Sequence, residues 1–291
     1  MKIIENRKKF FALSLVMILI GFAAMFYQGS KGNGMLNWDV EFTGGTAMEI
    51  DMGEAYDHDK LSEVIFNITG QKSPQIQDVI GTNEVAVKIQ SIDSETRGKL
   101  EDAIKAAFPL SDVKESSDVS GTVSSEMQKA AMKATFLACV AMLIYISIRF
   151  KDIRAGGSAI IALLHDVLFV IATYAIFRIP VNNTFIAVIL TILGYSVNAT
   201  IVIFDRIREN HDRFKPRETA EKINKSIAQT LARSINTSVT TLLAVGAVYV
   251  FGVQSIKEFA LPMMVGIVVG AYSSVCISGS VWFTLLPTKE K

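Results

Sequence analysis

The sequence predicts an α-helical membrane bundle of six transmembrane helices that carries one α+β domain outside the membrane. Half of the 291 residues are hydrophobic, and many of them lie in six apolar runs, each able to span roughly 30 Å of hydrocarbon. The charged residues are placed unevenly, because residues 29–126 contain 18 Asp or Glu against 8 Lys or Arg, although the whole chain has a net charge of only +1. The chain therefore joins an acidic polar domain to a basic membrane part.

The first apolar run, Phe10–Tyr27, follows a cluster of basic residues and is expected to be a membrane anchor. A cleaved signal peptide is the alternative, but the run is long and no clean small-x-small cleavage site follows it. The second of the six runs, Ala134–Ile148, is short and needs its flanking residues to complete a span. The five runs after the first cover about Ala134–Ile148, Ser158–Phe177, Phe185–Phe204, Ile235–Phe251 and Phe259–Leu286.

The basic residues predict the orientation, because Lys and Arg in short loops are held back from translocation. With the N-terminus inside, the inner segments hold 17 Lys or Arg, whereas the two short outer loops hold only Arg178 and Lys257. We therefore expect a multi-pass protein of the cytoplasmic membrane with both termini in the cytoplasm. Its expected parts are residues 1–28 with the first span, an outer domain at 29–127, five spans within 128–287 with a basic cytoplasmic segment at 206–233, and a tail at 288–291.

The outer domain is expected to have the ferredoxin-like order β-α-β-β-α-β. Alternating apolar positions predict a strand at Thr46–Asp51, and Pro74–Ile80 and Val85–Ile89 flank a Gly81–Glu84 turn like the strands of a hairpin. Helical spacing predicts helices at Lys60–Asn67 and Ser94–Ala107, and a polar strand is expected near Asp112–Val123. This domain has no visible catalytic constellation, so a binding or lever role is expected. Both cysteines, Cys139 and Cys276, fall in apolar runs, which leaves the domain without a disulfide, and with three His in the chain no metal site is expected.

Asp166 is the clearest candidate for a functional side chain, because it lies near the centre of an apolar run, next to His165. Ionisable groups at membrane depth are costly and mark functional sites. Burial raises a carboxyl pKa, so Asp166 could take up and release a proton; alternatively it is a structural acid, kept neutral or hydrogen-bonded between helices.

The fourth span is also partly polar. Tyr195 and Asn198 share one face at helical spacing, Ser196 and Thr200 share another flank, and Gly194 would allow a second helix to approach. The Asn198 amide either makes a structural hydrogen bond to another helix or has a functional role. Arg233, just before the fifth run, either extends to the membrane surface or points inward.

Four motifs together resemble the SecF family of protein-export membrane subunits. In order, they are Glu41-Phe42-Thr43-Gly44-Gly45-Thr46; Leu164-His165-Asp166; Gly194-Tyr195-Ser196-Val197-Asn198 with Phe204-Asp205-Arg206-Ile207-Arg208-Glu209-Asn210; and Arg233 with the Ser/Thr-rich segment that follows it. The match covers essentially the whole chain. Taken alone, the charges of Asp205, Arg206, Arg208 and Glu209 would also suit a solvated helix end and an inner anchor.

The sequence contains no recognisable enzyme constellation, so we expect neither enzymatic activity nor a cofactor. The resemblance implies a subunit of a bacterial or archaeal cell membrane. SecF-like chains pair with a SecD partner and, with it, use an ion gradient to promote export of an unfolded polypeptide through the SecYEG channel. Expected contacts are thus the SecD-like subunit, the channel, the translocating chain and membrane lipid, with no nucleic acid. An exporter of small molecules or lipids from the wider resistance-nodulation-division superfamily is the alternative, and the single short outer domain argues against it.

One position departs from the family pattern. Relatives usually have Asn-Asp-Thr or Asn-Asp-Ser in the fourth span, where this chain has Asn198-Ala199-Thr200. Proton transfer would then depend on Asp166 or on a partner carboxylate facing Asn198, or else a different ion would be coupled. Arg233 would need another anion or an open path to water.

Overall fold

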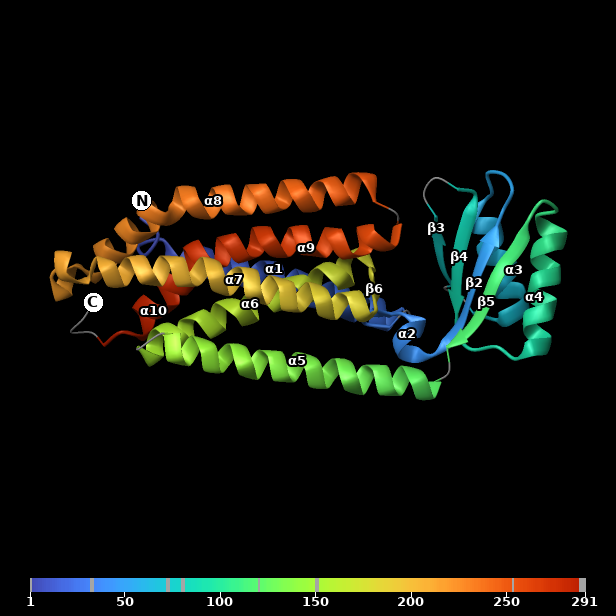
Figure 1. The fold of residues 1–291 in the computed structure, drawn as a ribbon, viewed down its shortest axis with the longest axis horizontal. Coiled ribbons are helices and arrows are strands. Elements are labelled where there is room, and N and C mark those ends of the chain that lie inside the picture. The colour runs from blue at the N-terminus through green and yellow to red at the C-terminus, as the bar shows by residue number, and fades with distance from the viewer. Residues whose placement is uncertain are drawn as a thin grey trace.

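The computed structural model has an elongated shape, with a bundle of long helices at one end and a four-stranded sheet with two helices at the other (Figure 1). It describes residues 2–31, 34–71, 74–79, 82–119, 121–149, 152–252 and 254–287. The expected tail at 288–291, the last residue of the expected strand Pro74–Ile80 and the first residue of the expected turn Gly81–Glu84 lie outside these residues.

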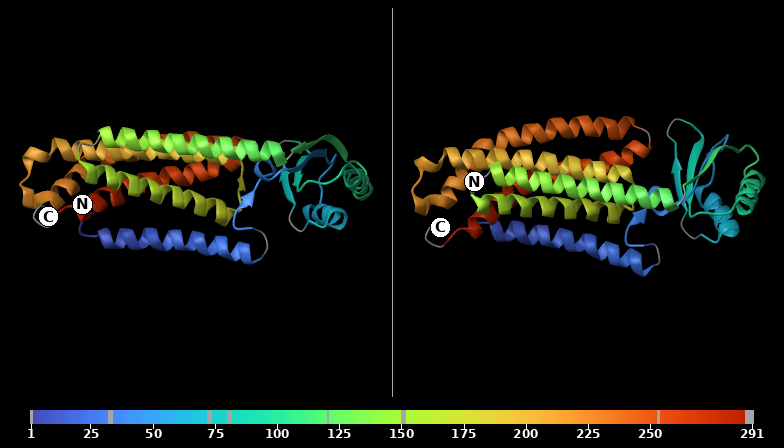
Figure 2. Two further views of the ribbon diagram at one scale, coloured as in Figure 1. Left: turned by 90° about the horizontal axis from the view of Figure 1, so that it is seen from below. Right: turned by 60° about the horizontal axis from the view of Figure 1, so that its bottom comes forward.

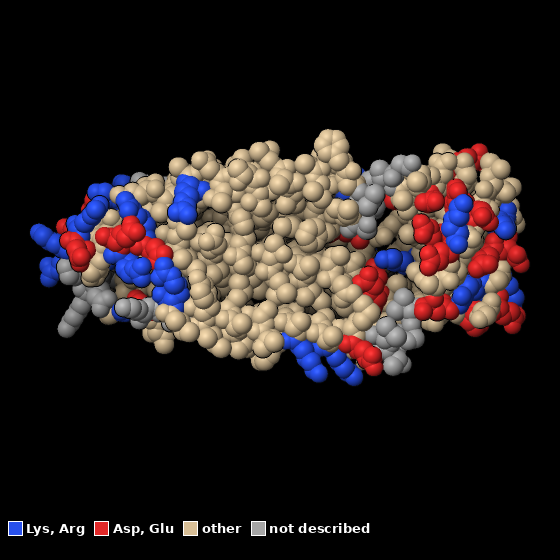
Figure 3. Space-filling view, viewed as in Figure 1, with Lys and Arg blue, Asp and Glu red and all other residues tan. Residues whose placement is uncertain are grey.

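Six helical segments of the described chain are long and apolar enough to cross a membrane, in agreement with the six apolar runs. In the view of Figure 3, Lys, Arg, Asp and Glu gather at the two ends of the molecule, and a broad belt between them is almost free of charge. The bounds of the six segments are α1 (Arg7–Ser30), α5 (Gly121–Arg149), α6 (Ile153–Phe177), α7 (Asn183–Glu209), α8 (Thr219–Phe251), and the sequence α9 (Gln254–Tyr272), η3 (Ser273–Ser278) and α10 (Gly279–Leu285).

The segments α6, α7 and α9 with η3 form the centre of the bundle, whereas α1, α5 and α8 expose most of their apolar side chains. Figure 2 shows α1 along one side of the bundle, next to α6. Small residues allow the close contacts. A Cβ on Gly21 of α1 would lie 2.1 Å from the Ala172 Cβ of α6, and one on Gly266 of α9 would lie 2.1 Å from Ile192 Cδ1 of α7. Glycine at such sites is typical of helix packing in membranes.

The small domain contains β2 (Gly45–Asp51), α3 (His58–Thr69), β3 (Gln75–Asp78), β4 (Glu84–Ile89), α4 (Ser94–Ala107) and β5 (Asp112–Val119). Its strands are antiparallel in the order β3-β4-β2-β5. Alternate residues of β2 and β4, such as Met48, Ile50 and Val87, pack with Leu61 and Ile104 of the two helices into one buried core. The helices lie on the side of the sheet away from the bundle, so the other sheet face is turned toward it (Figures 1 and 2).

Short elements join the two parts of the molecule. Strand β1 (Asn37–Trp38) pairs in parallel with β6 (Pro180–Val181), which lies between α6 and α7, and the single-turn α2 (Val40–Thr43) precedes β2. Side-chain oxygens begin several elements by accepting backbone N–H groups: Asp57 for α3, Asp93 for α4 and Asn182 for α7.

The structure corrects several expected boundaries. The strand near Asp112–Val123 ends at Val119, and α5 begins at Gly121, so residues 121–127 belong to a membrane helix and not to the outer domain. The basic segment at 206–233 includes the end of α7, the 3₁₀ turns η1 (His211–Arg213) and η2 (Pro216–Glu218), and the first four turns of α8. Both helices continue beyond the apolar runs because polar residues with helix propensity extend them into water.

Candidate functional site

Asp166 lies fully buried at the centre of the bundle, where it makes hydrogen bonds with three side chains. Ser196 Oγ and Ser273 Oγ donate to Asp166 Oδ2 at 2.5 and 2.8 Å, and His165 Nδ1 lies 2.9 Å from Asp166 Oδ1. Both carboxyl oxygens therefore have partners, as a buried polar group requires.

Three helical segments bring these groups together. Asp166 comes from α6, Ser196 from α7 and Ser273 from η3, the π-helical turn at the end of α9. Gly270 allows the approach, because a Cβ there would lie 3.4 Å from Ser196 Cβ and 3.7 Å from Asp166 Oδ2. A π-helical turn inside a helix is frequent at functional sites. Here it directs Ser273 and Ser274 toward α6 and α7.

The hydrogen bonds continue on both sides of Asp166. His165 Nε2 lies 2.9 Å from Ser14 Oγ of α1, and Ser14 lies 3.3 Å from the hydroxyl of Tyr272. On the other side, Thr200 Oγ1 lies 3.0 Å from Ser274 Oγ. We call Ser14, His165, Asp166, Ser196, Thr200, Tyr272, Ser273 and Ser274 the buried polar cluster. Hydroxyl groups can donate to a carboxylate or accept from a carboxylic acid, so this cluster can accommodate Asp166 with or without a proton.

The other predicted residues of α7 lie on a different face. Gly194 and Asn198 are exposed, and nothing in the described chain lies within 4 Å of a Cβ placed on Gly194. Tyr195 is half-buried and donates to Ser238 Oγ of α8 at 2.9 Å. Arg233 is also exposed, on α8. Within the described residues, no hydrogen bond or ion pair joins Asn198 or Arg233 to Asp166, so the predicted site divides into a buried and an exposed group.

The charged motif at the end of α7 forms a network of ion pairs. Asp205 pairs with Arg149 of α5 and, at 3.3 Å, with Arg208. Arg206 donates to Glu209 at 2.6 Å and to Gln229 of α8 at 2.7 Å. These side chains thus tie α7 to α5 and α8, which is more than the solvated helix end that their charges alone would suggest.

Next to this network, Asp152 begins α6. Burial opposes the ionisation of Asp152, but hydrogen bonds from the indole N–H of Trp282, at 2.9 Å, and from Arg154 outweigh it and hold its pKa below the ordinary value. Asp152, Trp282, Arg149 and Asp205 line part of a cavity of about 720 Å³ at this end of the bundle.

The motif that contains Phe42, Gly44 and Gly45 forms the junction between the domain and the bundle. Gly44 has φ +74°, which favours glycine, and a Cβ on Gly45 would lie 2.3 Å from the Ile89 carbonyl oxygen. The two glycines therefore allow the chain to turn tightly into β2. Phe42 is buried, and its carbonyl accepts a hydrogen bond from Gln128 of α5.

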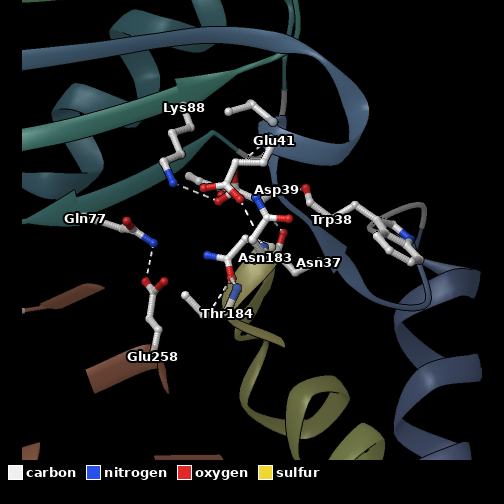
Figure 4. Close-up of polar contacts among 12 residues, drawn as sticks. Asn37, Trp38, Asp39, Glu41, Gln77, Lys88, Asn183, Thr184 and Glu258 are labelled. Carbon is white, nitrogen blue, oxygen red and sulfur yellow. Dashed lines mark hydrogen bonds and ion pairs between the residues drawn. The ribbon is translucent and has the colours of Figure 1, made fainter. Parts of the chain in front are cut away.

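The junction also contains polar contacts that the motifs did not indicate (Figure 4). Lys88 of β4 reaches Asp39, Gln77 of β3 reaches Glu258 of α9, and the backbone N–H of Asn183 donates to Glu41. The sheet thus contacts the end of α9 directly, and the chain that enters the sheet is attached to the end of α7.

Comparison with known proteins agrees with these motifs. The family described as "Protein export membrane protein SecD/SecF, C-terminal" matches residues 99–287. A curated SecF, the protein translocase subunit of Sebaldella termitidis, is 34% identical over 295 residues, which cover all of this chain and 93% of that protein. The chain belongs to the SecD/SecF family.

Other members of the SecD/SecF family extend this comparison. Protein translocase subunit SecF of Borreliella burgdorferi is 34% identical, with 94% of this chain and 93% of that protein covered. The crystal structure of SecDF, a translocon-associated membrane protein from Thermus thermophilus, superposes with a TM-score of 0.81 at 30% identity over 98% of this chain. Because only 38% of that SecDF chain is covered, this chain corresponds to about two fifths of it. A second SecDF structure, in a super-membrane-facing form, gives a TM-score of 0.68.

Within this SecD/SecF chain, sequence reasoning identified His165 and Ser196 beside Asp166 but missed Ser273, its third partner, and the outlying members Ser14 and Tyr272 of the buried polar cluster. Ser14, Tyr272 and Ser273 lie on helices far from residue 166 in the sequence, and hydroxyl residues are common in apolar helices. The run of serines at 273, 274, 278 and 280, all buried, is the one signal that could have indicated a polar lining.

Proposed function

We propose that this chain is an accessory membrane subunit of the Sec protein-export machinery, which pairs with a SecD-like subunit and uses an ion gradient to promote polypeptide translocation through SecYEG. Its proposed location is the cytoplasmic membrane, with both termini in the cytoplasm and a ferredoxin-like domain outside. The family, the names of its relatives and the distribution of basic residues support this proposal.

The observation that carries the proposal is an exposed polar surface on two membrane helices. We call it the open polar face and define it by Gly194 and Asn198 of α7 and by Arg233, Asn236 and Thr240 of α8, all exposed. An amide facing lipid in the middle of a span is costly, so Asn198 requires another polar surface. A SecD-like subunit that covers α7 and α8 would supply it.

The two polar groups of the membrane part suit different tasks in this scheme. The buried polar cluster holds Asp166, which could exchange a proton because its hydroxyl partners can both donate and accept. The open polar face holds Arg233 and Asn198, which could face an acidic residue of the partner. This division offers a way for the chain to function with Ala199 at the usual Asp position.

Cross-linking in native membranes tests the arrangement. We expect Asn198→Cys to form a disulfide with cysteines placed in the facing span of the SecD-like subunit, whereas Leu137→Cys, exposed on α5, does not. Loss of both subunits should also cause unprocessed secretory precursors to accumulate. Normal export in that double deletion would refute the export role, and cross-linking from Leu137 instead of Asn198 would refute the proposed partner surface.

A further inference from the structure

The base of the four-stranded domain contains a buried acidic side chain that is paired with the sheet. Asp39 is fully buried, and its Oδ2 lies 2.8 Å from Lys88 Nζ. Its other oxygen, Oδ1, accepts the backbone N–H of Glu41 at 3.0 Å and begins α2. Lys88 has an exposed side-chain fraction of 21%, so much of this ion pair is withdrawn from water. Removing one member of such a pair leaves a buried charge without compensation.

A second acidic side chain meets the same sheet from the bundle. Glu258 lies in the second turn of α9 and is 8% exposed, and its Oε1 accepts a hydrogen bond from Gln77 Nε2. Figure 4 shows the two contacts side by side, with Lys88 and Gln77 reaching down from the sheet. A carboxyl group at the end of a membrane helix can extend into water, so its burial against the domain indicates a specific contact.

The two sheet residues lie on adjacent strands and on the same face. Lys88 is opposite Gln75 and Gln77 is opposite Ala86, so Lys88 and Gln77 are diagonal neighbours, typically about 7 to 8 Å apart. Their side chains point away from the core, since Val87 and Ile76 pack on the other side. One contact would leave the domain free to rotate about it, whereas two separated contacts define an orientation.

The backbone joins the base of the domain to the bundle at a third place. The Asp39 N–H donates to the Val181 carbonyl at 3.2 Å, next to the β1–β6 pair, and Glu41 Oε2 accepts the Asn183 N–H at 3.0 Å, at the first turn of α7. These contacts hold Asp39 on the bundle. The Lys88 contact is therefore an attachment of the sheet to the bundle and not only to its own linker.

We propose that Asp39 and Glu258 are positioning residues that fix the orientation of the four-stranded domain on the membrane bundle through Lys88 and Gln77. The open face of the sheet is held toward the ends of α7 and α9, and α3 and α4 are held outward. The domain then acts as a fixed platform and not as a freely rotating lever. The orientation itself does not depend on the proposed export function. Only the use of a fixed domain in export rests on that function.

Distance measurements between spin labels test the orientation without any assay of export. Labels are placed at two exposed positions, Asp102→Cys of α4 and Lys133→Cys of α5, in the full chain with its partner subunit in nanodiscs and with Cys139 and Cys276 replaced by Ala. We expect one narrow distance distribution for this protein. Lys88→Met and, separately, Gln77→Ala should remove the single narrow peak, and Lys88→Arg should retain it because it keeps the ion pair.

Two controls distinguish orientation from folding. Lys99→Met removes an exposed ion pair with Glu95 on α4, far from the junction, and should leave the distribution unchanged. A label pair inside the domain, Asp59→Cys with Asp102→Cys, should give the same distance in every variant that is folded. A narrow, unshifted peak in both Lys88→Met and Gln77→Ala would overturn the proposal, as would a broad distribution before any contact is removed. Neither outcome would bear on whether the subunit promotes export.

Discussion

Replacement of Asp166 by Asn should separate proton exchange from structural support, because the two side chains have nearly the same shape. The Asn carbonyl oxygen can accept one hydroxyl proton and its amide can donate to a neighbouring oxygen. An amide cannot cycle a proton, so the gradient-dependent part of precursor export should be lost. The gradient-independent part should remain.

The structure also gives the expected change in stability. Two of the hydrogen bonds to Asp166 join different helices, from Ser196 and Ser273. Interhelical hydrogen bonds in membranes contribute about 0.6 kcal/mol on average and at most about 1.7 kcal/mol. Asp166→Ala, which loses both, should therefore destabilise the chain by about 1 to 3 kcal/mol, and Asp166→Asn by less than about 1 kcal/mol.

The assay combines two measurements on the same preparations. Import of a radiolabelled precursor into inverted membrane vesicles is followed with and without an ionophore, and unfolding of the purified complex gives the stability. Ser278→Ala is a suitable control, because this buried hydroxyl donates within its own helical segment, to Ser274 O at 2.7 Å. An undiminished gradient response in Asp166→Asn would refute the coupling role and leave Asp166 a structural residue.

Two further predictions concern packing and pH. Gly21→Leu should destabilise the chain by about 1 to 3 kcal/mol in unfolding measurements, because even a Cβ would meet Ala172 at 2.1 Å. Gly194→Leu has open space around it, so it should leave the free energy of unfolding unchanged but weaken co-purification of the partner. Burial and the hydrogen bond to Asp78 raise the pKa of Tyr56, so the stability that Tyr56 contributes should be complete below pH 10 and decline above it, where the unfolded chain loses the phenol proton first. Tyr56→Phe should abolish that alkaline decline in circular dichroism, and an equal decline in the variant would contradict the assignment.

Much of the fold could be predicted from the sequence, because its strongest signals are local. Apolar runs indicated the six long helices of the described chain, and alternating residues such as Met48 and Ile50 indicated the strand β2 of the domain. The β1–β6 pair could not be found this way, since two residues carry no periodicity and their partners are about 140 residues away. The boundary between β5 and α5 was placed too late because the polar residues 121–127 resemble strand and loop as much as helix.

The candidate site was predictable only in part, for a related reason. A charge in an apolar run is visible at once, so Asp166 and Arg233 were identified. Whether the two side chains lie together depends on how each helix is rotated about its own axis. In the structure Asp166 faces the inside of the bundle and Arg233 faces the outside. Glu258 was overlooked because, beside Lys257 at the end of a span, it resembled an ordinary loop residue.

The β1–β6 pair has a consequence for the order in which the protein is made. Residues 45–119 contain all strands of the four-stranded sheet, so this domain can fold while the ribosome is still synthesising α6. Its base lacks the β6 partner until Pro180 and Val181 have been synthesised, and Gln77 lacks its partner until α9 has been synthesised. Domains generally fold as units during synthesis, whereas contacts between distant segments form late. The Gln77 contact therefore forms only after most of the chain has been made, and a chain that stalls between residues 183 and 258 would carry a folded domain attached at its base but without this second contact.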